Sequence, residues 1–214
     1  MSKYCCFCYN TYMKKDHLYL FDLDGTLFDP SVFLQIILHR YAEQFVSDER
    51  VLLQVAQAYR GQLEKGSDFD PVHFLDLLSD KIHAPIEQLT DIFWNETHAY
   101  KQAVFLDVFP VLEVLQKRNI QLGIFSEGQM EYQKQKLLQS GLMKFFDQAS
   151  LHIFQRKLLQ DNLSLLPKES VVIDNQKDIV LTLQKNKIET IWINRKSEEK
   201  LVDMQTINTL QELI

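Results

Sequence analysis

The spacing of apolar positions along the chain changes twice and divides it into three parts. A continuous apolar run over residues 17–23 is typical of a strand buried on both faces in a parallel sheet. Residues 30–102 instead show helical spacing, in four segments with no strand pattern between them. Three of these segments begin with a proline at or near the first turn, as helices commonly do. This part of the chain is therefore predicted to be all-helical.

Strand and helix patterns alternate after the helical part. The pattern predicts strands over residues 120–126, 149–154, 169–174 and 188–194, with helices between them and a final helix at the end of the chain. Gly141 is placed to end the helix predicted over residues 128–141. Such alternation implies right-handed crossovers and a parallel sheet. We predict an α/β fold with a Rossmann-like core of residues 16–29 and 104–214, and an all-helical domain of residues 30–103 inserted after the first strand.

The first 15 residues carry all three cysteines of the chain, Cys5, Cys6 and Cys8. They lack a fourth ligand in zinc spacing, and neighbours this close would form strained disulfides, so reduced thiols are expected. Residues 1–15 are predicted to be a disordered N-terminal extension, and residues 1–12 are expected to be dispensable because Met13 reads like a natural start. The segment has no apolar core of a signal peptide, so the expected location is the cytoplasm.

The net charge changes the range of expected partners. A formal charge of −6 and a pI of about 5.5 argue against nucleic acid or an anionic membrane as a partner. They also mean that a phosphorylated substrate would need local positive charge or a metal ion in order to bind.

Polar residues with possible chemistry follow the predicted strands, where ligands bind in open parallel sheets. Asp22 and Asp24 end the first strand on the same side, and their repulsion favours a bound cation such as Mg²⁺. The later strands end near a hydroxyl group, a basic pair and two further carboxylates: Ser126, Arg156, Lys157, Asp174 and Asp178. Taken singly, each of these later residues could equally be a turn residue, a helix cap or a solvated charge.

The stretch from Phe21 to Asp29, FDLDGTLFD, resembles the first motif, DxDGTLxD, of the haloacid dehalogenase (HAD) superfamily. Ser126 is similar to the second motif, and Lys157 is the best match to the third. Asp174 and Asp178 resemble the acidic fourth motif. The helical part of the chain stands where this family carries its inserted C1 caps.

The resemblance implies a Mg²⁺-dependent phosphohydrolase that acts on a small phosphorylated metabolite through an aspartyl-phosphate. Asp22 would be the nucleophile and Asp24 the general acid and base. Lys157 would neutralise charge, and Ser126 would help to hold the phosphoryl oxygens. Substrate contacts are expected from Gly25, Thr26, Ser126, Glu127 and Gly128. Mg²⁺ would be held by Asp22, the main-chain carbonyl of Asp24, and Asp174 or Asp178.

Two departures from the family pattern leave alternatives open. Asn175 follows Asp174 where an acidic residue is usual, and Glu127 stands where many relatives carry asparagine. We expect Asp174 to face the metal and Asn175 to point away, although a shift of one residue would reverse the two. Arg156 likewise competes with Lys157 for the basic position. A phosphomutase, or a HAD-like binding protein with an eroded metal site, remains the alternative to a phosphatase.

Overall fold

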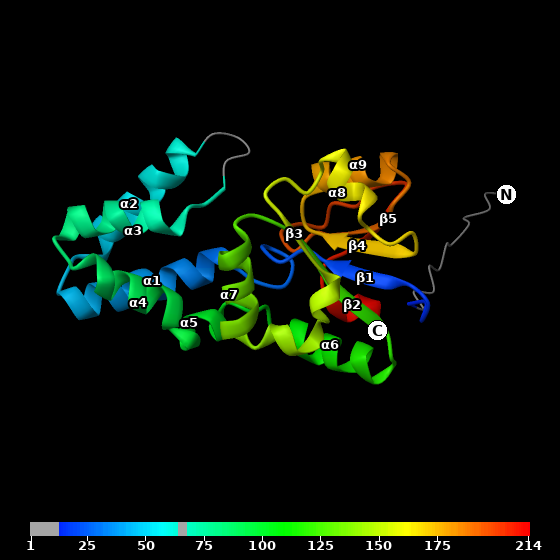
Figure 1. Cartoon of the computed structure of the whole chain (residues 1–214), viewed down its shortest axis with the longest axis horizontal. Coiled ribbons are helices and arrows are strands. Elements are labelled where there is room, and N and C mark those ends of the chain that lie inside the picture. Colours follow the sequence, from blue (N-terminus) through cyan, green and yellow to red (C-terminus); the bar gives the residue numbers. More distant parts are fainter. Residues whose placement is uncertain (1–12, 64–67) are drawn as a thin grey trace.

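The computed structural model describes residues 13–63 and 68–214 (Figure 1). Most of the predicted N-terminal extension, with its cysteines, lies outside these residues. The described end of that segment is tied to the first strand, because the backbone amide of Lys14 donates to the hydroxyl group of Tyr19 at 2.8 Å. The proposed domain boundaries at residues 29–30 and 103–104 stay a prediction.

Six strands form one parallel sheet, which confirms the predicted α/β class. Their spatial order is β3-β2-β1-β4-β5-β6, and every neighbouring pair runs parallel. The first strand therefore lies in the interior of the sheet, between β2 and β4. The strands are β1 (Leu18–Phe21), β2 (Gln121–Glu127), β3 (Leu151–Phe154), β4 (Ser170–Asp174), β5 (Glu189–Ile193) and β6 (Gln205–Ile207).

Helices cover both faces of the sheet, which explains the unbroken apolar sequence of β1. Tyr19 and Phe21 belong to the large apolar cluster shared with α6 and α7, whereas Leu18 and Leu20 pack into a smaller cluster with α8 and α9. Figure 1 shows the two pairs of helices on opposite sides of the strands. Their bounds are α6 (Val108–Lys117), α7 (Met130–Ser140), α8 (Gln160–Ser164) and α9 (Lys177–Lys185). As predicted, Gly141 ends α7 in the left-handed conformation.

The helices of residues 30–102 form a separate group beside the sheet (Figure 1). Asp29 and Asp70 cap α1 and α3, each accepting hydrogen bonds from two backbone amides of the first turn, and a proline follows each cap. No helix in the described ranges is long and apolar enough to cross a membrane. The bounds are α1 (Pro30–Phe45), α2 (Glu49–Gln62), α3 (Pro71–Ile82), α4 (Ile86–Asn95) and α5 (Thr97–Gln102).

The last of the four helical segments in the sequence spans residues 85–100, and its prediction as one helix is wrong, because the chain breaks at Glu96 into α4 and α5. The break lets Tyr100 fold back. Its hydroxyl group donates to the carbonyl oxygen of Phe93, and its ring centroid lies 4.4 Å from that of Phe33. Burial of these aromatic rings, which helical periodicity does not report, accounts for the break.

The end of the chain also differs from the prediction of a final helix. The strand β6 adds to β5, and a short 3₁₀ helix, η3 (Leu210–Leu213), follows it. Thr209 and Glu212 form a capping box at the start of η3, so the sequence here does carry a local signal for the start of a helix. Only pairing with β5 makes residues 205–207 a strand, and local sequence does not encode that contact.

A buried ion pair ties the loop after β1 to the end of the chain. The Arg195 guanidinium group makes two hydrogen bonds of 3.0 Å to the Asp107 carboxylate and also donates to the backbone oxygen of Thr26. Asp107 accepts further hydrogen bonds from the hydroxyl group of Thr209 and the backbone amide of Leu210. Burial raises the pKa of Asp107, but these hydrogen bonds outweigh burial and hold it below its usual value.

We predict that Arg195→Ala lowers the free energy of unfolding by about 3 kcal/mol, because the buried carboxylate of Asp107 loses its charged partner. Arg50→Ala is the matched control, since Arg50 pairs with Asp48 on the exposed surface and should change stability little. Urea unfolding followed by circular dichroism measures both variants. Equal effects of the two substitutions would contradict the assigned role of Arg195.

Candidate active site

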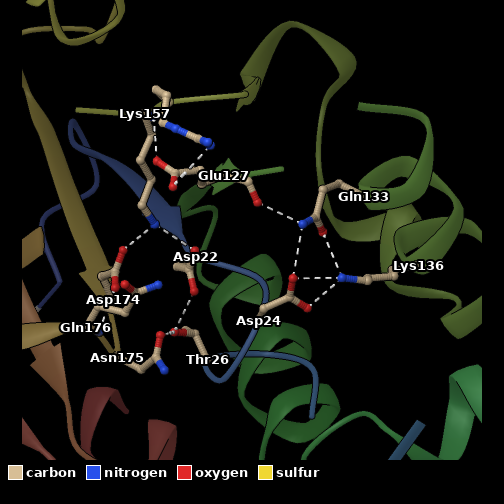
Figure 2. Close-up of polar contacts among 11 residues, drawn as sticks. Asp22, Asp24, Thr26, Glu127, Gln133, Lys136, Lys157, Asp174, Asn175 and Gln176 are labelled. Atoms are coloured by element: carbon tan, nitrogen blue, oxygen red, sulfur yellow. Dashed lines mark hydrogen bonds and ion pairs between the residues drawn. The ribbon is translucent and has the colours of Figure 1, made fainter. Parts of the chain in front are cut away.

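The site is built where the carboxyl ends of β1, β2 and β4 meet, with the loop after β3 lying over them. Asp22 follows β1 directly, and its backbone amide donates to the carbonyl oxygen of Ile173 in β4 at 2.9 Å. The ammonium group of Lys157 lies 2.7 Å from Asp22 Oδ1 and 2.5 Å from Asp174 Oδ2 (Figure 2). All three side chains are buried, and that of Lys157 is fully so. Lys157 therefore bridges two carboxylates that would otherwise repel each other.

Burial and charge act against each other in this triad. Burial raises the pKa of the Asp22 carboxyl group, Lys157 lowers it and Asp174 raises it, and the balance lies at about 7. Burial lowers the pKa of Lys157, but the carboxylates of Asp174 and Asp22 outweigh burial and raise it. Lys157 is thus held as the charged ammonium form, and it stabilises negative charge beside Asp22.

Glu127 holds the loop that carries Lys157. Its carboxylate accepts a hydrogen bond of 2.9 Å from the backbone amide of Lys157 and lies 3.9 Å from the guanidinium group of Arg156. Arg156 is directed away from Asp22 and pairs with Asp68 of the helical part at 2.8 Å. The basic group beside Asp22 is consequently Lys157 and not Arg156. These contacts with Arg156 and with the Lys157 amide explain why an acidic residue, Glu127, follows Ser126.

Asp24 has partners that the sequence reasoning missed. Lys136 of α7 donates to both of its carboxylate oxygens, at 2.8 and 2.7 Å, and Gln133 donates to one of them at 3.0 Å (Figure 2). Lys136 is only 2% exposed, and its ammonium group lies 4.2 Å from the ring centroid of Tyr132. A sequence signal existed: Lys136 occupies the same face of α7 as Tyr132, Gln133 and Leu137, the face that is buried.

The expectation that Asn175 points away from Asp22 is wrong. Its side-chain amide lies beside the Asp22 carboxylate, the backbone oxygen of Asp24 and the hydroxyl group of Thr26. Asp174 is the last residue of β4, and its carboxylate turns to Lys157 and to the backbone amide of Gln176. The chain turns directly after Asp174, so the next side chain, and not that of Asp174, reaches the region between Asp22 and Asp24.

Gly25 makes room for the Asn175 amide. Its φ is +85°, and a Cβ at this position would lie 2.2 Å from one end of the Asn175 side-chain amide. Thr26 is buried, and its hydroxyl group donates to Asp22 Oδ2 at 3.3 Å. Both residues of the predicted motif therefore shape the surroundings of Asp22.

The two other predicted binding positions lie at the end of β2. Ser126 is buried, and its hydroxyl oxygen has no hydrogen-bond partner among the residues that the structure describes. An unpartnered buried hydroxyl group is available to a ligand. Gly128 continues the sheet contact by donating to the carbonyl oxygen of Phe154, and a Cβ there would lie 2.7 Å from Gln133.

The carboxylates predicted to hold Mg²⁺ do not converge on one point. Asp174 is engaged by Lys157, and Asp178 is exposed in the first turn of α9. The backbone oxygen of Asp24, the other predicted ligand, faces the Asn175 amide, while the Asp24 carboxylate is engaged by Lys136. Among residues 13–63 and 68–214, no group of three or more His, Cys, Asp or Glu side chains could hold a metal ion. The residues present therefore do not fit the predicted Mg²⁺ site, which needs its carboxylates directed at one point.

Two cavities adjoin at this edge of the sheet. One of about 180 Å³ is lined by Asp22, Asp24, Glu127 and Gly128, together with residues of α7 and of the helical part. The other, of about 210 Å³, is lined mainly by apolar and aromatic side chains, with Arg60, Asp24 and Lys136 at its wall. Asp24, Lys136, Tyr132 and Phe69 line both cavities, so the Asp24 carboxylate lies between a polar and an apolar space.

We predict that Gly25→Ala destabilises the protein more than Gly141→Ala does. Both glycines have φ near +80°, but nothing lies within 4 Å of a Cβ at Gly141, whereas the Asn175 amide fills that space at Gly25. The backbone cost of about 1 kcal/mol is common to both, and the additional loss at Gly25 measures the contact with Asn175. Thermal unfolding of the two variants provides the comparison, and equal losses would contradict the close approach.

The sequence profile of the family described as haloacid dehalogenase-like hydrolase matches residues 19–193. This match covers most of the chain, and the chain belongs to this family. It is accordingly a hydrolase-family protein with the α/β fold described above. No curated protein sequence matches it.

Solved structures share this fold at low sequence identity. YfnB from Bacillus subtilis, solved bound to magnesium, is 16% identical with a TM-score of 0.59, over 94% of this chain and 97% of that one. A HAD phosphatase from Thermococcus onnurineus is 22% identical with a TM-score of 0.57, over 92% and 95%. A dehalogenase solved as an intermediate complex is 20% identical with a TM-score of 0.53, over 94% and 97%. Phosphatase and dehalogenase structures thus both resemble this chain in fold.

Proposed function

We propose that the chain is a phosphohydrolase that acts on a small phosphorylated metabolite through an aspartyl-phosphate on Asp22. The observation that carries the proposal is the pairing of Asp22 and Asp24 along one cavity, with Lys157 bound to the first carboxylate. A second carboxylate two residues after a buried one is suited to proton transfer next to a nucleophile. The similarity in fold to a phosphatase is consistent with this assignment.

The first half of the proposed reaction forms the intermediate. A carboxylate oxygen of Asp22 attacks the phosphorus atom, and the bond from phosphorus to the leaving oxygen breaks. That oxygen takes a proton from Asp24, which must enter this step in its protonated form. Lys157 stabilises charge on the Asp22 side of the phosphoryl group. The unpartnered hydroxyl group of Ser126 is available to a phosphoryl oxygen.

The second half releases phosphate. Asp24 now takes a proton from a water molecule, whose oxygen attacks the phosphorus atom and displaces the Asp22 carboxylate. The products are inorganic phosphate and the regenerated aspartate. Asp24 can serve both halves because it lines the cavity next to Asp22, and Lys136 and Gln133 fix its orientation.

The apolar cavity of about 210 Å³ is the proposed place of the leaving group. Phe69, Phe93 and Tyr132 line it, so the part of the substrate beyond the phosphate would be small and at least partly apolar or aromatic. Arg60 and Lys136 supply positive charge at its wall for an anionic substrate. A protein of net charge −6 needs such local charge, and we continue to propose no nucleic acid or membrane partner, and a cytoplasmic location.

Mg²⁺ is the cofactor that the family resemblance implies, and YfnB was solved bound to magnesium. The proposed reaction uses no metal, because residues 13–63 and 68–214 do not bring the predicted carboxylates together.

A binding protein without turnover is the second candidate function. It is favoured by the two ion pairs that already neutralise the carboxylates, Lys157 with Asp22 and Lys136 with Asp24. Such a protein would bind an organic phosphate in the same cavities and release it unchanged.

We predict that Asp22→Asn abolishes phosphate release from whichever phosphate monoester the wild-type protein hydrolyses, because an amide cannot form the acyl-phosphate. A panel of sugar, nucleoside and small aromatic phosphates, assayed for free phosphate, identifies the substrate first. The variant is then measured on that substrate, and circular dichroism checks that it is folded.

Asp48→Asn is the control, because asparagine caps the exposed start of α2 as well as aspartate does. It should keep wild-type rates. Wild-type turnover by Asp22→Asn would remove Asp22 from the role of nucleophile, and a phosphorylated product in place of free phosphate would indicate a phosphomutase. Substrate binding without turnover by the wild-type protein would favour the second candidate.

A further inference from the structure

We propose that the side-chain amide of Asn175 takes the place of a divalent cation at this site, so that hydrogen bonds and lysines hold the two aspartates and Mg²⁺ is bound only weakly. The proposal concerns what the folded chain binds, and it holds whether or not the chain hydrolyses a phosphate ester. The reason for it is that the residues present do not form the predicted Mg²⁺ site.

The position of the amide is the first observation. One end of the Asn175 amide lies 3.3 Å from Asp22 Oδ2 and 3.1 Å from the backbone oxygen of Asp24. These two atoms are hydrogen-bond acceptors only, and the two ends of an amide are nearly equal in size, so hydrogen bonding decides which end faces them. With the nitrogen atom in this place, Asn175 donates to both oxygens. One neutral group then links the nucleophile position to the loop of the motif.

The surrounding chain fixes the amide in this place. Gly25 leaves no Cβ where the amide sits, and the hydroxyl group of Thr26 lies 3.5 Å from the Asn175 side chain. The backbone oxygen of Asn175 accepts a hydrogen bond of 3.0 Å from the indole of Trp192 in β5. Asn175 is therefore held at both its backbone and its side chain, next to Asp22.

The charge around the site is the second observation. Asp22 and Asp174 share Lys157, which leaves this buried triad with one net negative charge. The Asp24 carboxylate, the nearest other anion in the motif, is paired with Lys136. A Mg²⁺ ion would lose much of its hydration and gain a single carboxylate that a buried ammonium group already neutralises. A second carboxylate at position 175 would supply the missing charge, and the chain has an amide there.

The opposite orientation of the amide makes a different prediction. With its oxygen atom toward Asp22 and Asp24, three oxygen atoms would face one another beside the Thr26 hydroxyl group, an arrangement that a bound cation would stabilise. The orientation of one amide group thus separates a cation-free site from a cation-dependent one, and Mg²⁺ binding decides between the two.

The experiment is a titration of the purified full-length protein with MgCl₂ by isothermal calorimetry, in parallel with thermal unfolding in EDTA and in excess Mg²⁺. We expect no saturable binding to the wild-type protein up to about 10 mM, and the same melting temperature in EDTA and Mg²⁺. Asn175→Asp should bind Mg²⁺ at least about ten-fold more tightly. It should also melt lower than the wild-type protein in EDTA and recover when Mg²⁺ is added, because the new carboxylate repels Asp22.

Two further variants serve as controls. Asn119→Asp adds the same charge at an exposed position and should not create Mg²⁺ binding. Asn175→Ala removes the amide without adding charge, and it should lower the melting temperature equally in EDTA and in Mg²⁺.

Submillimolar binding of Mg²⁺ by the wild-type protein that Asn175→Ala abolishes would overturn the proposal. Failure of a folded Asn175→Asp to gain binding would overturn it as well, because Asn175 would then not be the residue that excludes the cation. Neither result depends on activity, so a failure of the proposed hydrolase function remains a separate finding.

Discussion

The buried ammonium group of Lys157, held between the carboxylates of Asp22 and Asp174, is the interaction on which the rest of the site depends. Two like charges at the ends of adjacent parallel strands are costly to bury, and one shared cation offsets that cost. The sheet register that places Asp22 next to β4, and the Glu127 carboxylate that holds the Lys157 backbone, both bring these charges together. Strand pairing and loop position therefore both serve to bring the charges of Asp22, Lys157 and Asp174 together.

The second carboxylate of the motif is balanced in the same way but from another element. Lys136 comes from α7, close to the aromatic rings that α4 and the chain before α3 contribute, and it pairs with Asp24 at the border of the two cavities. The helical part also contacts the loop after β3 through the ion pair of Asp68 and Arg156. The space beside the aspartates is thus enclosed by the core and the helical part together.

Much of the fold could be predicted from the sequence, because its signals are local. The buried run of β1, the prolines and aspartates that start α1 and α3, and Gly141 at the end of α7 each act through neighbouring residues. The break at Glu96 and the strand β6 could not be predicted, since distant aromatic packing and sheet pairing cause them.

The candidate site, too, could be predicted only in part from the sequence. The motif from Asp22 to Thr26 indicated the location, and its spacing is a property of one strand and one turn. Lys136 and Gln133 were missed because a helix places them opposite Asp24 across more than 100 residues. The side chain of Asn175 was expected to point away from Asp22 because the exact end of a strand, which decides where the next side chain turns, is not readable from the sequence.

The central claim is that two lysines balance the charge of the aspartates, and that the Asn175 amide occupies the place of a divalent cation. A high-resolution crystal structure grown in excess Mg²⁺ tests it most directly. The account predicts the Asn175 amide nitrogen within hydrogen-bond distance of Asp22 Oδ2 and the Asp24 carbonyl oxygen, with Lys157 between Asp22 and Asp174 and no metal density among them. An octahedral ion about 2.1 Å from Asp22 Oδ2 and the Asn175 amide oxygen would contradict it.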